Sequence, residues 1–173
     1  MPSVRVVAGT AKGRKLVAPK GLDVRPTTDR AREAIGNRLL SMGVLADARV
    51  LDLFAGTGAL GIEALSRGAS HATFVDNAAQ SLQAIEHNLD ALGFADQATV
   101  VRADAVTFRP SGPVDIAFID PPYTWDGWAG LLQNLAASLV VCEARHPVEA
   151  PEGWELVRSD RYGTTVISLL RAP

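Results

Sequence analysis

The sequence contains a single cysteine, Cys142, which stands in the apolar run LVVCEA. One cysteine cannot form an intrachain disulfide, and its apolar neighbours predict a buried thiol rather than a reactive one. A chain without disulfides fits the reducing cytoplasm. We therefore expect a cytoplasmic protein.

Long apolar runs are also missing. None reaches the length of about 18 residues needed to cross a bilayer, and the N-terminal MPSVRVVAG lacks the apolar core of a signal peptide. Hydrophobic residues make up 47% and charged residues 21% of the 173 residues, as in a globular domain with a small appendage. We therefore expect no membrane partner.

Patterns for metal binding and nucleophilic catalysis are absent from the sequence. The three histidines and the cysteine have no metal-ligand spacing. No Ser/His/Asp arrangement stands out either. The expectation is a site without a metal ion.

Charge is unevenly distributed along the chain. Residues 1–40 carry nine Lys and Arg and three acidic residues, whereas the remainder carries eight basic and sixteen acidic residues. A basic arm on an acidic body indicates that the arm faces a polyanion such as nucleic acid. An ordinary solvated surface would have the same composition, so charge alone leaves both interpretations open.

The basic arm is predicted to be a β-hairpin followed by a helix. Residues 4–8 and 14–19 have strand patterns joined by a glycine turn, and Pro26 ends this unit. Residues 1–25 would thus form the appendage and 26–173 the main domain. Thr27 or Thr28 caps a helix that runs to about Met42. Three arginines lie off the apolar stripe of this helix: Arg30, Arg32 and Arg38.

From residue 49 onwards, strand and helix patterns alternate. The predicted strands are 49–54, 72–76, 98–102, 114–119 and 139–143, and the predicted helices are 59–67, 77–93 (capped by Asn77) and 128–138. Two antiparallel strands, 154–160 and 162–170, follow. This pattern predicts an α/β fold with a doubly wound, mostly parallel sheet of seven strands, in which the apolar strand 114–119 is central. Ligands bind such sheets at the carboxyl ends of the strands.

Acidic residues recur at these strand ends: Asp52, Asp76, Asp104 and Asp120. In the stretch VLDLFAGTGALG, residues 50–61, the three glycines match a dinucleotide-binding fingerprint. However, Asp52 lies inside the strand, where dinucleotide sites normally have apolar residues. Carboxylates suit the ammonium and sulfonium groups of S-adenosylmethionine (SAM) better than a pyrophosphate. We therefore expect SAM, with a nicotinamide-dependent oxidoreductase as the remote alternative.

The motif DPPY, residues 120–123, follows the central strand. Its two prolines remove backbone donors, so the loop presents carbonyls and a carboxylate. Such a set of acceptors suits a substrate amine, and Tyr123 can stack on a nucleobase. Trp125 and Trp128 either line the base pocket or pack the following helix.

These motifs resemble a known family. LDLFAGTGALGIEALSRGA followed by DPPY resembles the amino-methyltransferase class of Rossmann-like, SAM-dependent methyltransferases, and VRVVAGTAKGRKL, RPTTDRAREAIGNRL and YGTTVISLLR resemble the RsmD family. The resemblance covers nearly the whole chain. It implies a Rossmann-like methyltransferase fold and methyl transfer from SAM to N2 of a guanine in 16S rRNA, which is either free or part of a small-subunit assembly particle. We expect a monomer, since nothing in the sequence suggests a partner helix. Because DPPY also occurs in adenine amino-methyltransferases of DNA and RNA, another base stays an alternative.

The resemblance also implies roles for individual residues. Those that would bind the cofactor are Asp52, Ala55, Gly56, Thr57, Gly58, Asp76, Asn77, Asp104 and Ala105, with Thr28 and Arg30 closing over the cofactor or contacting RNA. Those that would hold the target guanine are Asp120, Pro121, Pro122 and Tyr123. Those that would contact RNA phosphates are Lys12, Arg14, Lys15 and Arg32. Gly36 replaces the bulky apolar residue that is usual in the family, which predicts looser packing of its helix.

Overall fold

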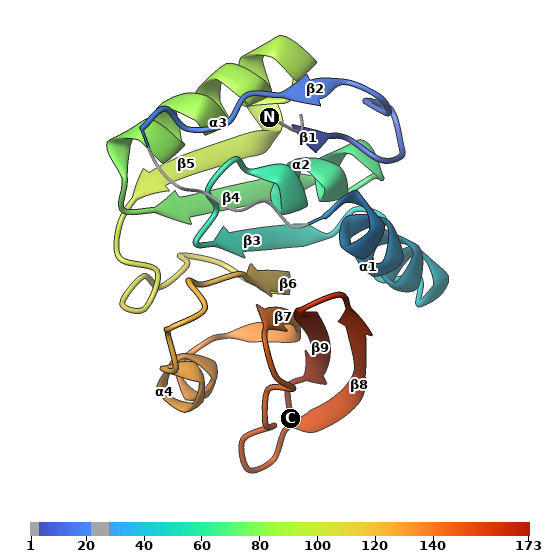
Figure 1. The fold of residues 1–173 in the computed structure, drawn as a ribbon, viewed down its shortest axis with the longest axis vertical. Coiled ribbons are helices and arrows are strands. Elements are labelled where there is room, and N and C mark those ends of the chain that lie inside the picture. The colour runs from blue at the N-terminus through green and yellow to red at the C-terminus, as the bar shows by residue number, and fades with distance from the viewer. Residues whose placement is uncertain (1–3, 22–27) are drawn as a thin grey trace.

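The computed structural model describes residues 4–21 and 28–173. These residues form a seven-stranded sheet in the order β5-β4-β3-β6-β7-β9-β8 and a separate two-stranded hairpin (Figure 1). The hairpin strands are β1 (Val4–Arg5) and β2 (Lys15–Leu16). The sheet strands are β3 (Arg49–Leu53), β4 (His71–Asp76), β5 (Ala98–Arg102), β6 (Val114–Ile119), β7 (Ala137–Ala144), β8 (Glu155–Tyr162) and β9 (Thr165–Arg171). The helices are α1 (Asp29–Ser41), α2 (Ala59–Ser66), α3 (Ala79–Leu92) and α4 (Trp128–Gln133), with a short 3-10 turn η1 (Ala95–Gln97).

The strand pairing confirms the predicted fold class. Strands β5, β4, β3, β6 and β7 are parallel to one another, and β9 is antiparallel to both β7 and β8. The chain builds outward from β3 to β5 and then returns to β6 on the other side of β3. This reversal places a topological switch point between β3 and β6, where a ligand crevice is expected at the carboxyl ends of the strands.

Alternating side chains divide the core between the two faces of the sheet. On one face, Val50 and Ile116 pack with residues of α1, α2 and α3. On the other face, Leu51 and Ile119 pack with residues of α4. Because residues two apart in a strand point to the same side, Asp52 shares the face of Val50 and lies under α2.

Helix α2 packs closely on the sheet and is buried along its whole length. A Cβ atom at Gly61 would lie 2.4 Å from Cε1 of Phe74, which is shorter than real contacts allow. Only glycine therefore lets α2 approach β4 this closely. This position of the glycine pattern serves helix–strand packing rather than ligand contact.

The hairpin strands are shorter than predicted. Beyond Val6, the backbone N–H groups of Val7 and Ala8 donate to the Glu63 carboxylate in α2, at 2.8 and 3.0 Å, instead of to a partner strand. Val4, Val6 and Leu16 belong to the same hydrophobic cluster as α2. Pro26, Thr27 and the predicted domain boundary lie outside the described residues, so the two-domain division stays a prediction.

Two predictions about helix ends are wrong and one is confirmed. Helix α4 ends at Gln133, because Ala137 already pairs with Val114 in the sheet. Asn77 does not cap α3: the N-cap residue is Ala78, and its N–H donates to the Asp76 carboxylate at 3.0 Å. Thr28 does cap α1, since its hydroxyl accepts from the Ala31 N–H at 3.2 Å.

The prediction that Gly36 loosens the packing of α1 is also wrong. Gly36 is buried, and a Cβ atom there would lie 2.3 Å from Cζ of Arg67. The guanidinium group of Arg67, at the end of α2, thus fills the space that a side chain at position 36 would occupy. Close packing at this point depends on a glycine and an arginine together.

Cys142 is buried in β7, and burial raises the pKa of its thiol well above the ordinary value. Over the described residues, none of the helices has the length and apolar character that crossing a membrane requires.

Candidate active site at the carboxyl ends of the strands

The glycine loop, residues 54–58, connects β3 to α2 and needs unusual backbone angles. Phe54, Gly56 and Gly58 all have positive φ, at 56°, 57° and 79°. The Gly58 N–H donates to the Ala55 carbonyl at 2.8 Å, and the Ala59 N–H donates to the Thr57 hydroxyl at 3.2 Å. The loop therefore satisfies several of its own donors.

Asp76, at the end of β4, holds this loop against the neighbouring strand. One carboxylate oxygen accepts from the Gly56 N–H and the other from the Ala78 N–H, each at 3.0 Å. Each oxygen has further lone pairs that could accept from the hydroxyls of a ribose. The structure thus brings Asp76 to the glycine loop, 20 residues away in the sequence.

Asp52 is 1% exposed and lies beneath the same loop. Burial raises the pKa of its carboxyl to about 8, the charge of Asp76 adds to this shift, and a 2.9 Å hydrogen bond from the Gly61 N–H opposes it. A carboxyl in this setting gains most from a cationic partner, because an opposite charge favours its ionised form.

This set of groups fits SAM better than a dinucleotide. Phosphate-binding loops offer free backbone N–H groups, whereas the N–H groups of Gly56, Gly58 and Gly61 are bound by protein oxygens here. The loop also contains no lysine or arginine. The groups beside it are the carboxylates of Asp52 and Asp76, which suit cationic groups such as an ammonium and a sulfonium.

Three of the other predicted cofactor residues follow β4 and β5 at the same edge of the sheet. Asn77 is exposed after β4, and its carbonyl accepts from Nε of Arg102 at 3.2 Å. Asp104 is exposed after β5 and accepts from the Val106 N–H at 2.9 Å, while Ala105 is buried. Arg30 is exposed in the first turn of α1.

Asn88 in α3 is a residue that the sequence interpretation missed. It is 2% exposed, and its amide donates to the carbonyls of Val17 and Thr57, at 3.0 and 3.1 Å, and accepts from the Val17 N–H at 2.8 Å. The side chain therefore joins the chain after the hairpin to the glycine loop. The signal in the sequence was an amide side chain at position 88, between the apolar residues Ile85 and Leu89 of the predicted helix.

The DPPY motif forms the loop that follows the central strand β6. Pro121 is buried, and the Pro122 carbonyl accepts from the Trp125 N–H at 2.9 Å. The Trp125 ring lies 5.5 Å from that of Phe54, edge to face, so the DPPY segment and the glycine loop are in contact. Trp125 also meets Trp128 at 5.0 Å, and both pack against the core beneath α4, which confirms their packing role.

Tyr123 has two defined partners from the C-terminal part of the chain. Its hydroxyl lies 2.9 Å from the Thr165 hydroxyl, and the guanidinium carbon of Arg145 lies 4.5 Å from the ring centroid. Both partners come from elements distant in sequence from the DPPY motif.

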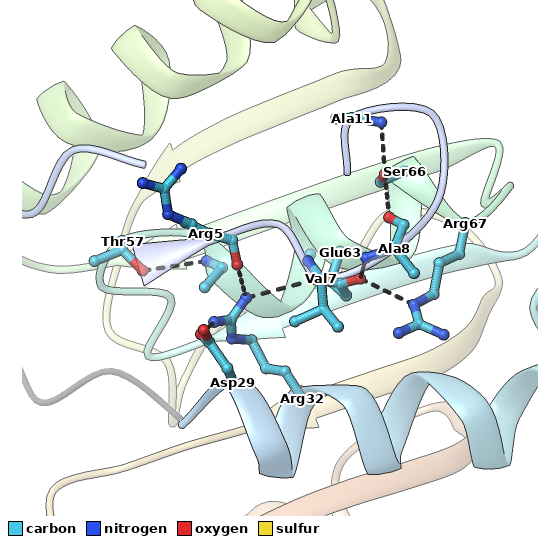
Figure 2. A network of polar contacts seen from close by, with 12 residues as sticks. Arg5, Val7, Ala8, Ala11, Asp29, Arg32, Thr57, Glu63, Ser66 and Arg67 are labelled. Atoms are coloured by element: carbon cyan, nitrogen blue, oxygen red, sulfur yellow. Dashed lines mark hydrogen bonds and ion pairs between the residues drawn. The ribbon is translucent and has the colours of Figure 1, made fainter. Parts of the chain in front are cut away.

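The predicted RNA contact at Arg32 is wrong for this structure. Arg32 is 1% exposed, and the polar groups that surround its guanidinium offset the cost of its burial (Figure 2). Its guanidinium donates to the Arg5 carbonyl at 2.6 Å and pairs with Asp29 and with Glu63. Burial lowers the pKa of Arg32, and the charges of Asp29, Glu63 and Glu143 oppose this shift. The residue fastens the N-terminal arm to the domain.

The turn of the hairpin lies at the opposite edge of the sheet from the glycine loop. The Thr10 N–H donates to the carbonyl of Ser66, the last residue of α2, at 2.8 Å. Arg14 donates to the carbonyl of Ala91, near the end of α3, at 2.9 Å. Both helices begin at the carboxyl edge, so their last turns lie at the amino edge. Lys12 and Lys15 are exposed beside Arg14.

A cavity of about 360 Å³ lies elsewhere, between α1 and the strands β7, β8 and β9. Its lining includes Arg38, Arg158 and Tyr162 but none of the predicted site residues.

The fold and the site together define a Rossmann-like methyltransferase. Two solved structures of low identity have this fold: an RNA methyltransferase from Salinibacter ruber in complex with S-adenosyl-L-homocysteine (15% identity, TM-score 0.67, 86% and 94% of the two chains covered) and the magnesium protoporphyrin IX methyltransferase ChlM of Synechocystis with bound SAM (15%, 0.68, 83% and 79%). The chain belongs to the RsmD family: the family model described as Conserved hypothetical protein 95 matches residues 4–171.

Individual relatives agree with this assignment. The ribosomal RNA small subunit methyltransferase D of Haemophilus influenzae is 32% identical over 177 residues, covering 92% of this chain and 89% of that protein. The protein of the same name from Escherichia coli K12 is 43% identical over 122 residues, covering 69% of this chain and 60% of that protein. A solved structure of yhhF from Escherichia coli, which its description assigns to the methyltransferases, has a TM-score of 0.84 and 37% identity over 99% of this chain and 98% of that one.

Proposed function

We propose that this protein transfers a methyl group from SAM to the exocyclic N2 of a guanine in 16S rRNA of the small ribosomal subunit. The observation that carries the proposal is the contact between two loops. The acceptor-rich DPPY segment packs on the glycine loop through Trp125 and Phe54, with ring centroids 5.5 Å apart. A substrate amine held by the first loop would thus lie beside a cofactor held by the second. Membership in the RsmD family and the names of the relatives support small-subunit rRNA as the substrate.

The carboxylates and the glycine loop would hold the cofactor. Asp52 would face its ammonium group, Asp76 its ribose hydroxyls, and Asp104 with the backbone at Ala105 its adenine. Bound SAM supplies an electrophilic methyl group on a sulfonium. Holding that methyl and the amine in line accounts for most of the rate enhancement, because orientation replaces an improbable encounter.

The DPPY loop would prepare the amine. An exocyclic amine is a poor nucleophile, because its lone pair conjugates with the ring. Asp120 and a carbonyl in the Pro121 region would accept hydrogen bonds from its two N–H groups and so orient the lone pair toward the methyl group. The N–C bond would form as the methyl–sulfur bond breaks, S-adenosylhomocysteine would leave, and Asp120 would take the single proton that the methylated amine releases. Prolines at 121 and 122 remove backbone N–H groups that would compete with the amine as donors. Tyr123 would stack on the base.

The test is methylation of small ribosomal subunits from a strain that lacks the gene, with labelled SAM and mapping of the modified nucleotide. We expect one methylated guanine N2. Asp120→Asn should lower kcat by about 100-fold or more, as loss of a proton-accepting group does, while the Kd for SAM stays the same. Asp126→Asn, an exposed acid in the same connection, is the matched control and should retain activity.

Methylation of adenine instead of guanine would refute the proposed base. Full activity of Asp120→Asn would refute the proposed role of the carboxylate. A thermal-shift response to NAD but not to SAM would favour the oxidoreductase alternative.

A further inference from the structure

The structure assigns to Arg145 and Thr165 a role as positioning residues for the target base, exerted through Tyr123. The inference rests on the proposed function, in which Tyr123 stacks on the base. It adds two residues from the C-terminal part of the chain, one from the loop after β7 and one from the start of β9. Neither belongs to the DPPY motif or to the cofactor loop.

The hydroxyl of Tyr123 is anchored at the sheet. It lies 2.9 Å from the hydroxyl of Thr165, a residue that is only 8% exposed. Thr165 is the first residue of β9 and pairs with Tyr162 of β8, so its position is set by the antiparallel part of the sheet. A hydrogen bond from so rigid a point fixes the far end of the tyrosine ring.

The face of the ring is fixed by a charge. The guanidinium carbon of Arg145 lies 4.5 Å from the ring centroid, well within the range of about 6 Å for a cation–π contact. Arg145 is exposed and follows β7 directly. A base that stacks on Tyr123 would therefore use the face opposite Arg145, and the ring would lie between the base and the guanidinium.

Together the two contacts restrict both the tilt and the translation of the ring. Methyl transfer needs the amine in line with the methyl group, and a displacement of about 1 Å can cost about 100-fold in rate. A loosely held stacking platform would allow such displacements. The C-terminal strands, which contribute nothing to the predicted cofactor site, thereby become part of the substrate site.

Kinetics of single variants on small ribosomal subunits test the role of Arg145. Arg145→Gln should lower kcat/KM for RNA about fivefold, the upper end for a cation–π contact at an exposed site, with an unchanged KM for SAM. Arg145→Lys should recover most of the loss, because an ammonium group also binds an aromatic face. Arg161→Gln removes the same charge from an exposed residue of β8 and should stay within about twofold of the wild type.

A double-mutant cycle tests the role of Thr165. Tyr123→Phe and Thr165→Val each remove one hydroxyl of the same hydrogen bond. Each should lower kcat several-fold, and the double variant should be no worse than the worse single variant. Thr164→Val, at the exposed neighbouring position, is the control for a structural effect. SAM affinity should be unchanged throughout, and loss of the hydrogen bond should lower the melting temperature by only about 2–4 °C.

Three results would overturn the inference: equal effects of Arg145→Gln and Arg161→Gln, additive effects in the cycle, or an increase of kcat/KM in Arg145→Gln. The last would mean that the guanidinium occupies the place of the base. A wild-type protein that methylates a different nucleic acid would refute the proposed function only, since the same comparison of variants on that substrate still decides the role of Arg145 and Thr165.

Discussion

Replacing Glu63 by glutamine tests how the N-terminal arm is held on the domain. The Glu63 side chain is 4% exposed and accepts from four donors. One oxygen accepts from the Val7 N–H at 2.8 Å and from Arg32 at 3.5 Å. The other accepts from the Ala8 N–H at 3.0 Å and from Nε of Arg67 at 2.9 Å. Figure 2 shows these contacts between α2, the hairpin and α1.

The expected loss follows from the burial of the partners. The side chains of Arg32 and Arg67 are 0% and 4% exposed, and Nη2 of Arg67 already has no hydrogen-bond partner among the described residues. Glutamine keeps the volume but removes the charge and turns an NH2 group toward N–H donors. Removing one partner of a buried ion pair costs about 3–5 kcal/mol. For a chain of this size, a loss of about 3 kcal/mol corresponds to a fall in Tm of about 6–12 °C.

Urea unfolding followed by tryptophan fluorescence measures the change in free energy of unfolding. The matched control is Glu155→Gln, which breaks the exposed pair between Glu155 and Arg171 and should cost less than about 1 kcal/mol. Trypsin should also cut the Glu63→Gln protein faster at Lys12 and Lys15, because Val7 and Ala8 lose their anchor. A loss below about 1 kcal/mol with unchanged proteolysis would refute the reasoning that the buried carboxylate holds the arm.

Two further predictions concern the cofactor and the RNA. The folded pKa of Asp52, about 8, lies above its unfolded value, so ionising this group costs stability as the pH rises from about 4 to 8. Binding of SAM at pH 7 should lower that pKa, so the carboxyl should release about one proton. Titration calorimetry in two buffers of different ionisation enthalpy measures the number of protons released, and Asp52→Asn should release none. Equal binding enthalpies of the wild type in the two buffers would contradict the prediction. The second prediction compares two triple variants that remove equal charge, one at the hairpin (Lys12, Arg14 and Lys15 to Gln) and one at exposed arginines of the active-site edge (Arg102, Arg109 and Arg145 to Gln). If the carboxyl edge faces the RNA, the triple variant at the active-site edge should reduce the slope of log K for RNA against log salt by about 2, and the hairpin triple variant should change the slope less. A larger change in the hairpin variant would instead place the RNA phosphates at the hairpin.

Patterns between near neighbours were enough to predict the elements and the edge at which the site lies. Strand β6 and the end of α3 at Gly93 agree with prediction, because a continuous apolar run and a glycine in the left-handed conformation are local signals. The predicted end of α4 failed at Ala137, where pairing with β6 outweighs helix propensity. Helix propensity is a weak preference that tertiary contacts override.

The roles of charged residues depended far more on the fold. The sequence alone placed Arg32 on a solvated face, since only its helical position was visible. Its carbonyl partner is 27 residues away, and the carboxylate that binds the arm is 56 residues from Val7. No spacing rule connects residues so far apart.

The sequence by itself therefore determined the order of strands and helices, the acidic residues at the strand ends and the glycine spacing, because each depends on side chains a few residues apart. Tertiary structure decided that Arg32 is a buried anchor, that the hairpin turn lies away from the site, and that Tyr123 is held by Thr165, 42 residues later. These are contacts between segments that only folding brings together, and their strength comes from the burial that the completed core imposes.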